Sequence, residues 1–443
     1  MINRLKLVDI LSRSSIHKNY LDFKVSQYSS TEYLDLIQWS QFKKLISHAY
    51  NNVPYYRNLM NGLNLRPSDF KSIKDLVKLP VLTKSKIKEH YNDLKADNLR
   101  KYHSKKQKTG GSTGEPLEFL SDRKTWSIHW ALKLRSWEMG GYILGEPVAF
   151  LGGRSLIPDT LSLKKRLFNK IMNFQIYPSL EINEKLLLNY IKSIRKKNIQ
   201  VLRGYPDVIN QLAQTCLRND IKLPIKLVIS TADTLRVEHK KNIKRIFSCI
   251  IIDSYGSADG GGNASTCEFD NGFHISTEVA IWEVTNKEGE LINNNEIGDV
   301  TLTSLTNYAM PFIRYQPGDL ISSFIDYSQC RCQRNLPKIK KISGRSADSI
   351  KLPNGRSLNG HSFSAIIKKF AIDQWQIIES KNQIEVKILP SNQFQKSDMH
   401  KFMNDLNLLC RDSIEIKVTI SKFNDFVTSK SGKNRVIIKD TSL

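Results

Sequence analysis

Between residues 199 and 256 the chain alternates short apolar runs with amphipathic segments, and this alternation constrains the fold more than any other feature. The apolar runs are IQVLRG (199–204), IKLVIST (225–231) and CIIIDSYG (249–256). The segments between them have the three- and four-residue apolar spacing of helices, one of which begins near Pro206. This order predicts a parallel sheet with helices on its faces. Ligands of such sheets bind beyond the carboxyl ends of the strands, where GYP, STAD and DSYG follow here.

The remaining segments predict the surroundings of this sheet. The first hundred residues have mainly helical spacing, and short alternating runs at about 270–343 indicate antiparallel strands. Beyond a junction at 342–360, the patterns predict a helix at 367–380, then a strand, a helix and a strand. We therefore expect an α/β protein with a large N-terminal domain (1–344) of mixed and parallel sheets flanked by helices. A small α+β C-terminal domain (345–443) follows.

Charge and composition narrow the class of protein. The chain has 443 residues, of which 67 are basic and 43 acidic, giving a net charge of +24. This charge suits anionic partners, but the basic residues are spread along the chain without interleaved aromatics, so no nucleic-acid partner is expected. No apolar run is long enough to span a membrane. We expect the protein in the cytoplasm. The first fifteen residues have the spacing of a short amphipathic helix, so association with the inner face of the membrane is the alternative.

The segment KTGGSTGEP (108–116) is rich in glycine and hydroxyl side chains. It lacks the spacing of a Walker loop, so it is not that motif. Successive backbone N–H groups in such a turn can bind a phosphate, but the same composition also suits a flexible linker. Taken alone, the segment leaves both interpretations open.

Five further motifs follow this segment in order: STADTL (230–235), DSYGSADGG (253–261), MPFIRYQPGDL (310–320), SGRSADSIKLPNG (343–355) and SKSGKNRV (429–436). Together with NNVPYYRNL (51–59) and LPVLTKSKI (79–87), they resemble the phenylacetate–CoA ligase branch of the adenylate-forming enzymes and its capsule-biosynthesis homologues. The resemblance covers nearly the whole chain.

The resemblance implies that a substrate carboxylate attacks the α-phosphate of ATP to give an acyl-adenylate and pyrophosphate, after which a thiol or amine displaces AMP. ATP with Mg²⁺ is then the cosubstrate, and coenzyme A is one expected acceptor. Lys433 would contact the α-phosphate and carboxylate oxygens, and Asp259 would approach the metal. The residues implied to bind the nucleotide are Thr109, Gly110, Gly111, Ser112, Thr113, Gly114, Ala232, Asp233, Asp253, Tyr255, Gly256, Asp319 and Arg345.

Within this set, Tyr255 would pack on adenine and Asp319 would accept hydrogen bonds from the ribose. The stretch 345–351 would be the hinge of a mobile C-terminal domain. The chain departs from the family pattern at Asp259, where glutamate is usual, at Gln316 and Pro317, and at Ala347. Taken singly, Tyr255 and Asp319 would be ordinary core and turn residues, so their roles depend on the ordered set.

Three cysteines and one histidine form a second pattern. Cys267 and His274 are seven residues apart, and Cys330 and Cys332 form a Cys-x-Cys pair. Three thiolates and one imidazole suit a closed, structural Zn²⁺ site, although the spacing is not that of a zinc finger. The alternative is a set of buried cysteines and an exposed pair. Members of the resembled branch carry such a metal site, which implies zinc here without a catalytic role.

For the substrate, the sequence indicates a position for the acyl pocket and a set of candidate acceptors. The acyl pocket is expected beside RGYPDV and SADGGGN, where Gly260, Gly261 and Gly262 would leave space and Tyr205 and Trp130 would flank a ring. The acceptor is a thiol, an amine or a sugar hydroxyl, and the capsule-like resemblance favours cell-surface polysaccharide biosynthesis. Two alternatives remain: a nucleotidyltransferase that leaves AMP on its acceptor, and a non-catalytic scaffold with the same fold.

Overall fold

The computed structural model describes most of the chain, and its elements follow the predicted order except at 367–380. The described residues are 4–109, 117–153, 162–179, 182–292, 296–322, 325–345, 349–354, 357–359, 363, 366–367, 369–380, 383–391, 393–422, 425–427 and 436–439. The helices are α1 (Arg4–Ser12), α2 (Ile16–Ser26), α3 (Thr31–Asn52), α4 (Pro54–Gly62), α5 (Lys84–Glu89), α6 (Arg123–Glu138), α7 (Leu163–Met172), α8 (Glu184–Lys196), α9 (Pro206–Arg218), α10 (Val237–Phe247) and α12 (Lys396–Cys410).

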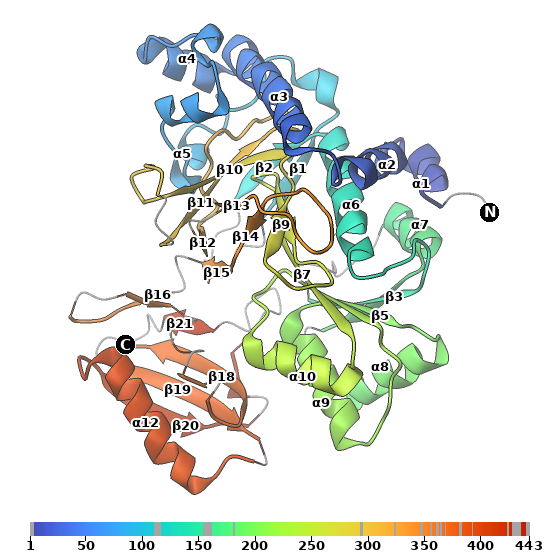
Figure 1. The fold of residues 1–443 in the computed structure, drawn as a ribbon, viewed down its shortest axis with the longest axis vertical. Coiled ribbons are helices and arrows are strands. Elements are labelled where there is room, and N and C mark those ends of the chain that lie inside the picture. The colour runs from blue at the N-terminus through green and yellow to red at the C-terminus, as the bar shows by residue number, and fades with distance from the viewer. Residues whose placement is uncertain are drawn as a thin grey trace.

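A nine-stranded mixed sheet forms the centre of the molecule (Figure 1). In spatial order its strands are β13 (Ile325–Asp326), β14 (Lys338–Ile339), β9 (Phe273–Ile275), β8 (Gly262–Ser265), β7 (Ile250–Ser257), β6 (Leu227–Thr231), β5 (Val201–Gly204), β3 (Val148–Gly152) and β4 (Phe174–Pro178). The strands from β4 to β7 are parallel, and those from β7 to β13 are antiparallel. The parallel sheet predicted over 199–256 is confirmed.

Alternate residues of the parallel strands serve two different cores. In β3, Val148 and Phe150 pack in the cluster that contains Trp137 of α6, whereas Ala149 and Leu151 pack in the cluster formed with α8, α9 and α10. Successive side chains of a strand point to opposite faces, so helices cover both faces of this sheet. The close packing explains Gly204 at the end of β5, since a Cβ atom there would lie 1.9 Å from the carbonyl oxygen of Leu151.

A second sheet joins the amino-terminal helices to the centre. It contains β10 (Ala280–Thr285), β11 (Ile297–Ser304), β12 (Asp319–Ser322) and β15 (Ile342–Arg345), all antiparallel. The core under α3, α4 and α5 includes Phe42, Ile281 and Phe312. The mainly helical start and the antiparallel strands after residue 270 are therefore confirmed. No helix in the described part of the chain is both long and apolar enough to cross a membrane.

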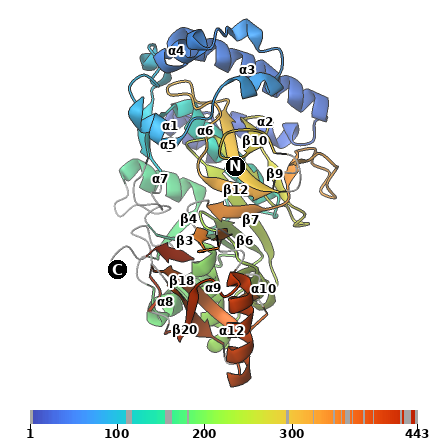
Figure 2. The ribbon, with the colours of Figure 1, turned by 90° about the vertical axis from the view of Figure 1, so that its left-hand side faces the viewer.

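The carboxyl-terminal residues form a separate small sheet with α12 on one side (Figures 1 and 2). Its strands are β20 (Glu415–Ile420), β19 (Gln383–Pro390), β18 (Ile372–Glu379) and β21 (Ile437–Lys439), with the hairpin of β16 (Ser349–Lys351) and β17 (Ser357–Asn359) near its start. The α+β character is confirmed, but the helix predicted over 367–380 is wrong in its second half, which is β18. This strand lies between β19 and β21 and buries four consecutive residues, so it lacks the alternation that identifies a strand in a sequence.

Candidate active site

Two sheets bring the predicted nucleotide residues together. Tyr255 lies in β7 of the large sheet and Asp319 begins β12 of the second sheet, and the Tyr255 hydroxyl donates a hydrogen bond to Asp319 Oδ2 at 2.7 Å. Trp282 of β10 packs against the Tyr255 ring with 5.8 Å between the ring centroids. Asp319 is also paired in the β12–β15 ladder with Arg345. Residues from three distant motifs therefore meet at one place.

Asp259 lies beside this pair and is held from both sides. Ser257 donates to Asp259 Oδ1 and Tyr315 donates to Asp259 Oδ2, each at 2.7 Å, and the residue is 8% exposed. Burial and the Asp259 carboxylate hold the pKa of Tyr315 well above its usual range, so this phenol remains a donor. The two hydroxyl groups fix the orientation of a carboxylate that is one methylene shorter than the family's usual glutamate.

The strand ends place the other predicted residues around this pair. Ala232 follows β6 with a left-handed φ of 67°, and the adjacent Asp233 accepts a hydrogen bond from the backbone N–H of Thr234 at 2.8 Å. Asp253 and Gly256 are in β7 with Tyr255, and Asp253 is paired with Ser230 of β6. Burial raises the pKa of Asp253 to about 7, and the neighbouring Ser230 hydroxyl opposes that shift.

The glycine-rich segment connects the two strands of a hairpin. Lys108 of β1 (Lys105–Lys108) pairs with Glu118 of β2 (Glu118–Ser121), and Thr109 and Leu117 are joined by two hydrogen bonds of 2.9 Å. The described flanks of the segment are therefore paired with each other, and the choice between a phosphate loop and a linker stays a prediction. Gly110, Gly111, Ser112, Thr113, Gly114, Ala347 and Lys433 lie outside the described residues.

The glycines after Asp259 do not leave space as expected. A Cβ atom at Gly260 or at Gly262 would lie 2.7 Å from Leu302 Cδ1, and one at Gly261 would lie 2.6 Å from Ser304 Oγ. Both contacting residues belong to β11. These glycines therefore allow the two sheets to approach each other, and that prediction was wrong.

The four predicted metal ligands do come together. The ligand atoms of Cys267, His274, Cys330 and Cys332 all lie within 4.8 Å of one another, and all four side chains are buried. His274 Nε2 lies 3.4 Å from Cys332 Sγ, while His274 Nδ1 lies 3.3 Å from the carbonyl oxygen of Leu336. The carbonyl orients the imidazole so that Nε2 faces the sulfur atoms, as in many zinc sites. We call these four residues the Cys/His cluster.

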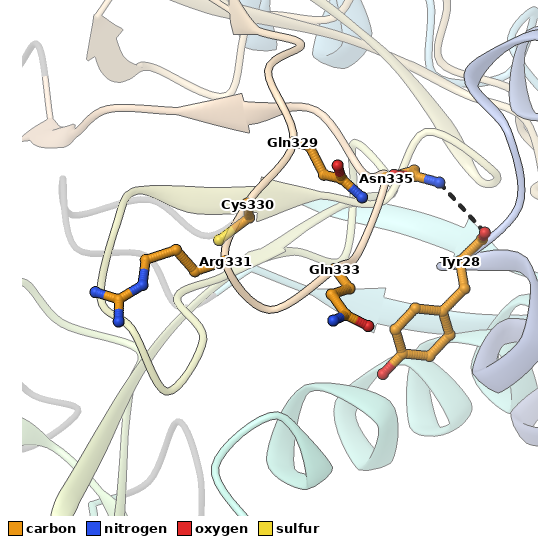
Figure 3. A pocket seen from close by; sticks show the side chains of 6 residues that line it. All are labelled: Tyr28, Gln329, Cys330, Arg331, Gln333 and Asn335. Carbon is orange, nitrogen blue, oxygen red and sulfur yellow. Dashed lines mark hydrogen bonds between the residues drawn. The ribbon is translucent and has the colours of Figure 1, made fainter.

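A hollow on the protein surface borders the loop that carries two of these cysteines (Figure 3). Its lining is polar, and the amide of Asn335 donates a hydrogen bond to the carbonyl oxygen of Tyr28 at 3.2 Å. The lining residues are Tyr28, Gln329, Cys330, Arg331, Gln333 and Asn335. None of the residues predicted for the nucleotide lines this hollow, so we assign it no part in the reaction.

The prediction from sequence missed three basic residues near Asp259. His129 and Lys133 are one turn apart on α6, and Arg203 is in β5. Lys133 lies over the Trp130 ring and Arg203 over the Trp137 ring, and the centroids of these two rings are 6.4 Å apart, so the fold brings the two cations together. The charges of Lys133 and Asp259 both act on His129. We call His129, Lys133 and Arg203 the basic cluster. Arginine within the apolar run IQVLRG was the signal in the sequence that could have indicated it.

Comparisons with known proteins agree with the fold and with the motifs. No protein-family model matches the chain. Protein CapK of Staphylococcus aureus is 24% identical over 416 residues, covering 91% of this chain and 89% of its own. The phenylacetate-coenzyme A ligase of Thermus thermophilus is 23% identical over 330 residues and that of Escherichia coli is 24% identical over 334, covering 72% and 73% of both chains respectively.

Solved structures match over most of the chain as well. A 2-hydroxyisobutyryl-CoA ligase in the postadenylation state, in complex with R3-HIB-AMP, has a TM-score of 0.74 at 16% identity, covering 93% of this chain and 90% of its own. The same enzyme in the thioesterification state gives a TM-score of 0.59 at 17% identity and the same coverage. The resemblance seen in the sequence is therefore confirmed: the chain is a relative of the phenylacetate-coenzyme A ligases and of Protein CapK, and it has the fold of adenylate-forming CoA ligases.

Proposed function

We propose that the chain is an AMP-forming ligase, which converts a carboxylic acid and ATP to an acyl-adenylate and pyrophosphate and then transfers the acyl group. The observation that carries this proposal is the contact between Tyr255 and Asp319 beside the fixed Asp259 carboxylate. It lies at the ligand-binding edge of a parallel sheet. The CoA ligases among the relatives support the same class of reaction.

The Tyr255–Asp319 hydrogen bond suits a nucleoside. It holds the phenol ring in one orientation beside Trp282, so the ring can stack on a base, while the Asp319 carboxylate can accept hydrogen bonds from ribose hydroxyls. Arg345, whose backbone is paired with Asp319, would help to hold the nucleotide. Ala232 and Asp233 would line the base at the end of β6, with Asp253 and Gly256 beside them in β7.

The first half-reaction joins two anions, a carboxylate and the α-phosphate. The protein must therefore neutralise charge and fix geometry more than supply an acid or a base. Mg²⁺ would accompany the ATP phosphates and Asp259 would approach it. The backbone N–H groups of 110–114, in the loop between β1 and β2, would bind the β- and γ-phosphates, and Lys433 would contact the reacting oxygens.

We further propose that the chain divides into domains at 344/345 and that the small one turns between the half-reactions. In this structure Trp375 of β18 donates to Glu238 of α10 at 2.8 Å, and the Arg236 guanidinium lies 4.9 Å from the Trp375 ring. The higher TM-score with the postadenylation state than with the thioesterification state supports assigning this arrangement to the first half-reaction. A turn at 345–351 would then move Lys433 away and admit the acceptor.

The Cys/His cluster would hold a structural Zn²⁺. Three sulfur atoms and one imidazole nitrogen, all buried, match the soft and closed set of ligands that structural zinc prefers. Such a site has no open position, so zinc would link β9 to the loop before β14 and would not take part in the reaction.

The relatives support one acceptor and one pathway. CoA is favoured because the phenylacetate-coenzyme A ligases and 2-hydroxyisobutyryl-CoA ligase are named for it, with an amine or a sugar hydroxyl as the alternative acceptor. The match to CapK along nearly the whole chain supports a role in cell-surface polysaccharide biosynthesis. The net charge of +24 would suit work in the cytoplasm at the inner face of an anionic membrane.

The test is pyrophosphate release from ATP across aryl acids, fatty acids, amino acids and uronic acids. A ligase releases pyrophosphate with its own acid, and Asp319→Asn should raise the KM for ATP about tenfold or more through the lost charge-assisted contact. A nucleotidyltransferase would instead accumulate a stable adenylylated product. ATP binding with no release for any of these acids, or for the doubly charged acids named below, would indicate a scaffold and would refute the ligase.

A further inference from the structure

The charge of Asp259 reaches the basic cluster, and Asp259 also lies beside the proposed nucleoside site. Asp259 accepts a hydrogen bond from Tyr315. The charges of Asp319 and Tyr255 also help to raise the pKa of the Tyr315 phenol. The Asp259 charge also acts on His129. Arg203 lies at the carboxyl end of β5, and the neighbouring strands β6 and β7 end at the proposed nucleoside site, so the cluster belongs to the same edge of the sheet.

Aromatic rings support the cationic groups of this cluster. The Arg203 guanidinium carbon lies 4.8 Å from the centroid of the Phe150 ring and 5.4 Å from that of Trp137, and Lys133 Nζ lies 5.0 Å from that of Trp130. Trp130 also stacks on Phe174 at 6.0 Å. Ring faces attract cations but leave their N–H groups without acceptors. The N–H groups can therefore still take an anion.

The structure contrasts Arg203 with two other buried arginines. Arg135 pairs with Glu278 at 2.6 Å and Arg314 pairs with Glu283 at 3.0 Å. Arg203 is 7% exposed, yet among the described residues no carboxylate pairs with it, and its buried Nε has no hydrogen-bond partner there. A buried cation without a counter-charge is costly, so a site that keeps one is suited to an anion from outside.

Lys133 is a second cation whose charged form is disfavoured by its surroundings. Burial, followed by the charges of Arg203 and of Lys165 on α7, lowers the pKa of Lys133 to about 8. The described carboxylate that acts on the cluster is that of Asp259, which Ser257 and Tyr315 already orient. An anion bound between Lys133 and Arg203 would supply the missing negative charge.

From this cluster, and resting on the proposed ligase function, we propose that the acid adenylated by this protein carries a second anionic group, a carboxylate or a phosphate, bound by Lys133 and Arg203 with His129 beside them. The triphosphate of ATP is the other source of such an anion. The aromatic rings around the cluster favour an organic acid, because Trp130, Phe168 and Phe174 offer apolar faces that a phosphate chain would not use.

The experiment compares matched acids that differ in one anionic group: butyrate with glutarate, phenylacetate with 4-carboxyphenylacetate, and gluconate with 6-phosphogluconate. For each pair we would measure acid-dependent pyrophosphate release, and binding by tryptophan fluorescence, for the wild type, Lys133→Met and Arg203→Met. Lys124→Met is the matched control, because Lys124 is an exposed lysine of the same helix.

The wild type should prefer the doubly charged acid of at least one pair about tenfold or more in kcat/KM or in affinity, the size of one charge-assisted contact. Lys133→Met should abolish this preference with an unchanged KM for ATP, and Lys124→Met should retain it. Absence of a preference in every pair would overturn the proposal, and so would a preference unchanged in Lys133→Met. A raised KM for ATP with unchanged acid preference would assign the cluster to the triphosphate and likewise overturn it.

The fluorescence arm separates this proposal from the proposed ligase function. Binding of the doubly charged acid that is lost in Lys133→Met supports the anion site even if no acid releases pyrophosphate, an outcome in which the ligase function alone fails. Pyrophosphate release with singly charged acids alone would support the ligase and refute the second anionic group. Should Arg203→Met fail to fold, Lys133→Met still decides the outcome because that side chain keeps partial exposure.

Discussion

The Cys/His cluster and the basic cluster are both built from elements far apart in the sequence, but only the first is complete by itself. In the Cys/His cluster four buried ligand atoms lie within 4.8 Å, a spacing that one metal ion would satisfy. In the basic cluster Lys133 and Arg203 face aromatic rings without a carboxylate partner among the described residues. The difference teaches that buried ligand atoms serve stability in one cluster, while buried and half-buried cations without a carboxylate partner serve, in our proposal, substrate recognition in the other.

The largest effect should come from a residue outside both clusters. Lys433→Ala removes the cation that would stabilise charge in the transition state of adenylation, so acid-dependent pyrophosphate release should fall about 10²- to 10³-fold. The melting temperature and ATP binding should change little. The matched control is Lys430→Ala in the same segment, which should stay near the wild-type rate. Equal rates for the two variants would remove Lys433 from the catalytic residues.

Breaking the Cys/His cluster should lower stability rather than change the chemistry. Cys267→Ala removes one ligand of a structural metal, so zinc content should fall and unfolding should become easier by about 3 kcal/mol. Calorimetry with metal analysis measures both. Cys216→Ala is the control, since this buried cysteine of α9 is not a ligand and should cost about 1 kcal/mol with unchanged zinc. Equal losses in the two variants, with no zinc in the wild type, would contradict the metal site.

Removing the Lys133 charge from the basic cluster should raise the free energy of unfolding, whereas breaking the Cys/His cluster lowers it. Folding lowers the pKa of Lys133 from 10.5 to about 8, so the folded state binds fewer protons than the unfolded state between those pH values. The charged side chain therefore costs stability below about pH 8, and this cost shrinks as the pH rises towards 10.5.

Without ligand at pH 7, Lys133→Met should stabilise the protein by about 1–2 kcal/mol, a value reduced to allow for the partial exposure of the side chain. Thermal unfolding at pH 7 and pH 10 would show a gain that diminishes at the higher pH. Destabilisation at both pH values would show that Lys133 has a partner within the chain and would remove the contrast between the clusters.

The smallest effect concerns the contact between the two proposed domains. Trp375→Phe keeps a ring beside Arg236 but removes the hydrogen bond to Glu238, which is worth about 1 kcal/mol. The arrangement seen here would then be less populated, so adenylation should slow about fivefold relative to acyl transfer in single-turnover experiments. If both half-reactions change equally, the contact does not select between them.

The sequence predicts the parallel sheet and the contacts within the motifs well, because both follow from local patterns. The apolar runs at 225–231 and 249–256 are β6 and β7, and the Cys-x-Cys pair reaches Cys267 and His274. Strand β18 was misassigned because its position in the middle of a sheet removes the alternation of a half-buried strand. A fully buried strand is recognised from an unbroken apolar run, as in β6, but not in β18, where the buried positions include Gln374 and Gln376.

The features that the sequence could not supply are created by packing between sheets. The sequence predicts that the glycines after Asp259 leave space for the acyl group, but Leu302 and Ser304 of β11 fill that space. Arg203 seemed to be part of an apolar run, and only the fold places it near Lys133 of a helix seventy residues earlier. That Tyr255 and Asp319 serve one nucleotide site was implied by the family resemblance alone, because the two residues belong to different sheets.

The most direct test of the central claim follows oxygen from the acid to AMP. An acid that supports pyrophosphate release would be labelled with ¹⁸O in its carboxylate and incubated with ATP and CoA. The released AMP should gain one ¹⁸O atom per turnover, because the carboxylate oxygen that attacks the α-phosphate leaves with AMP when the thiol takes the acyl group. Unlabelled AMP, or AMP that stays on the acceptor, would contradict the acyl-adenylate and with it the proposed function.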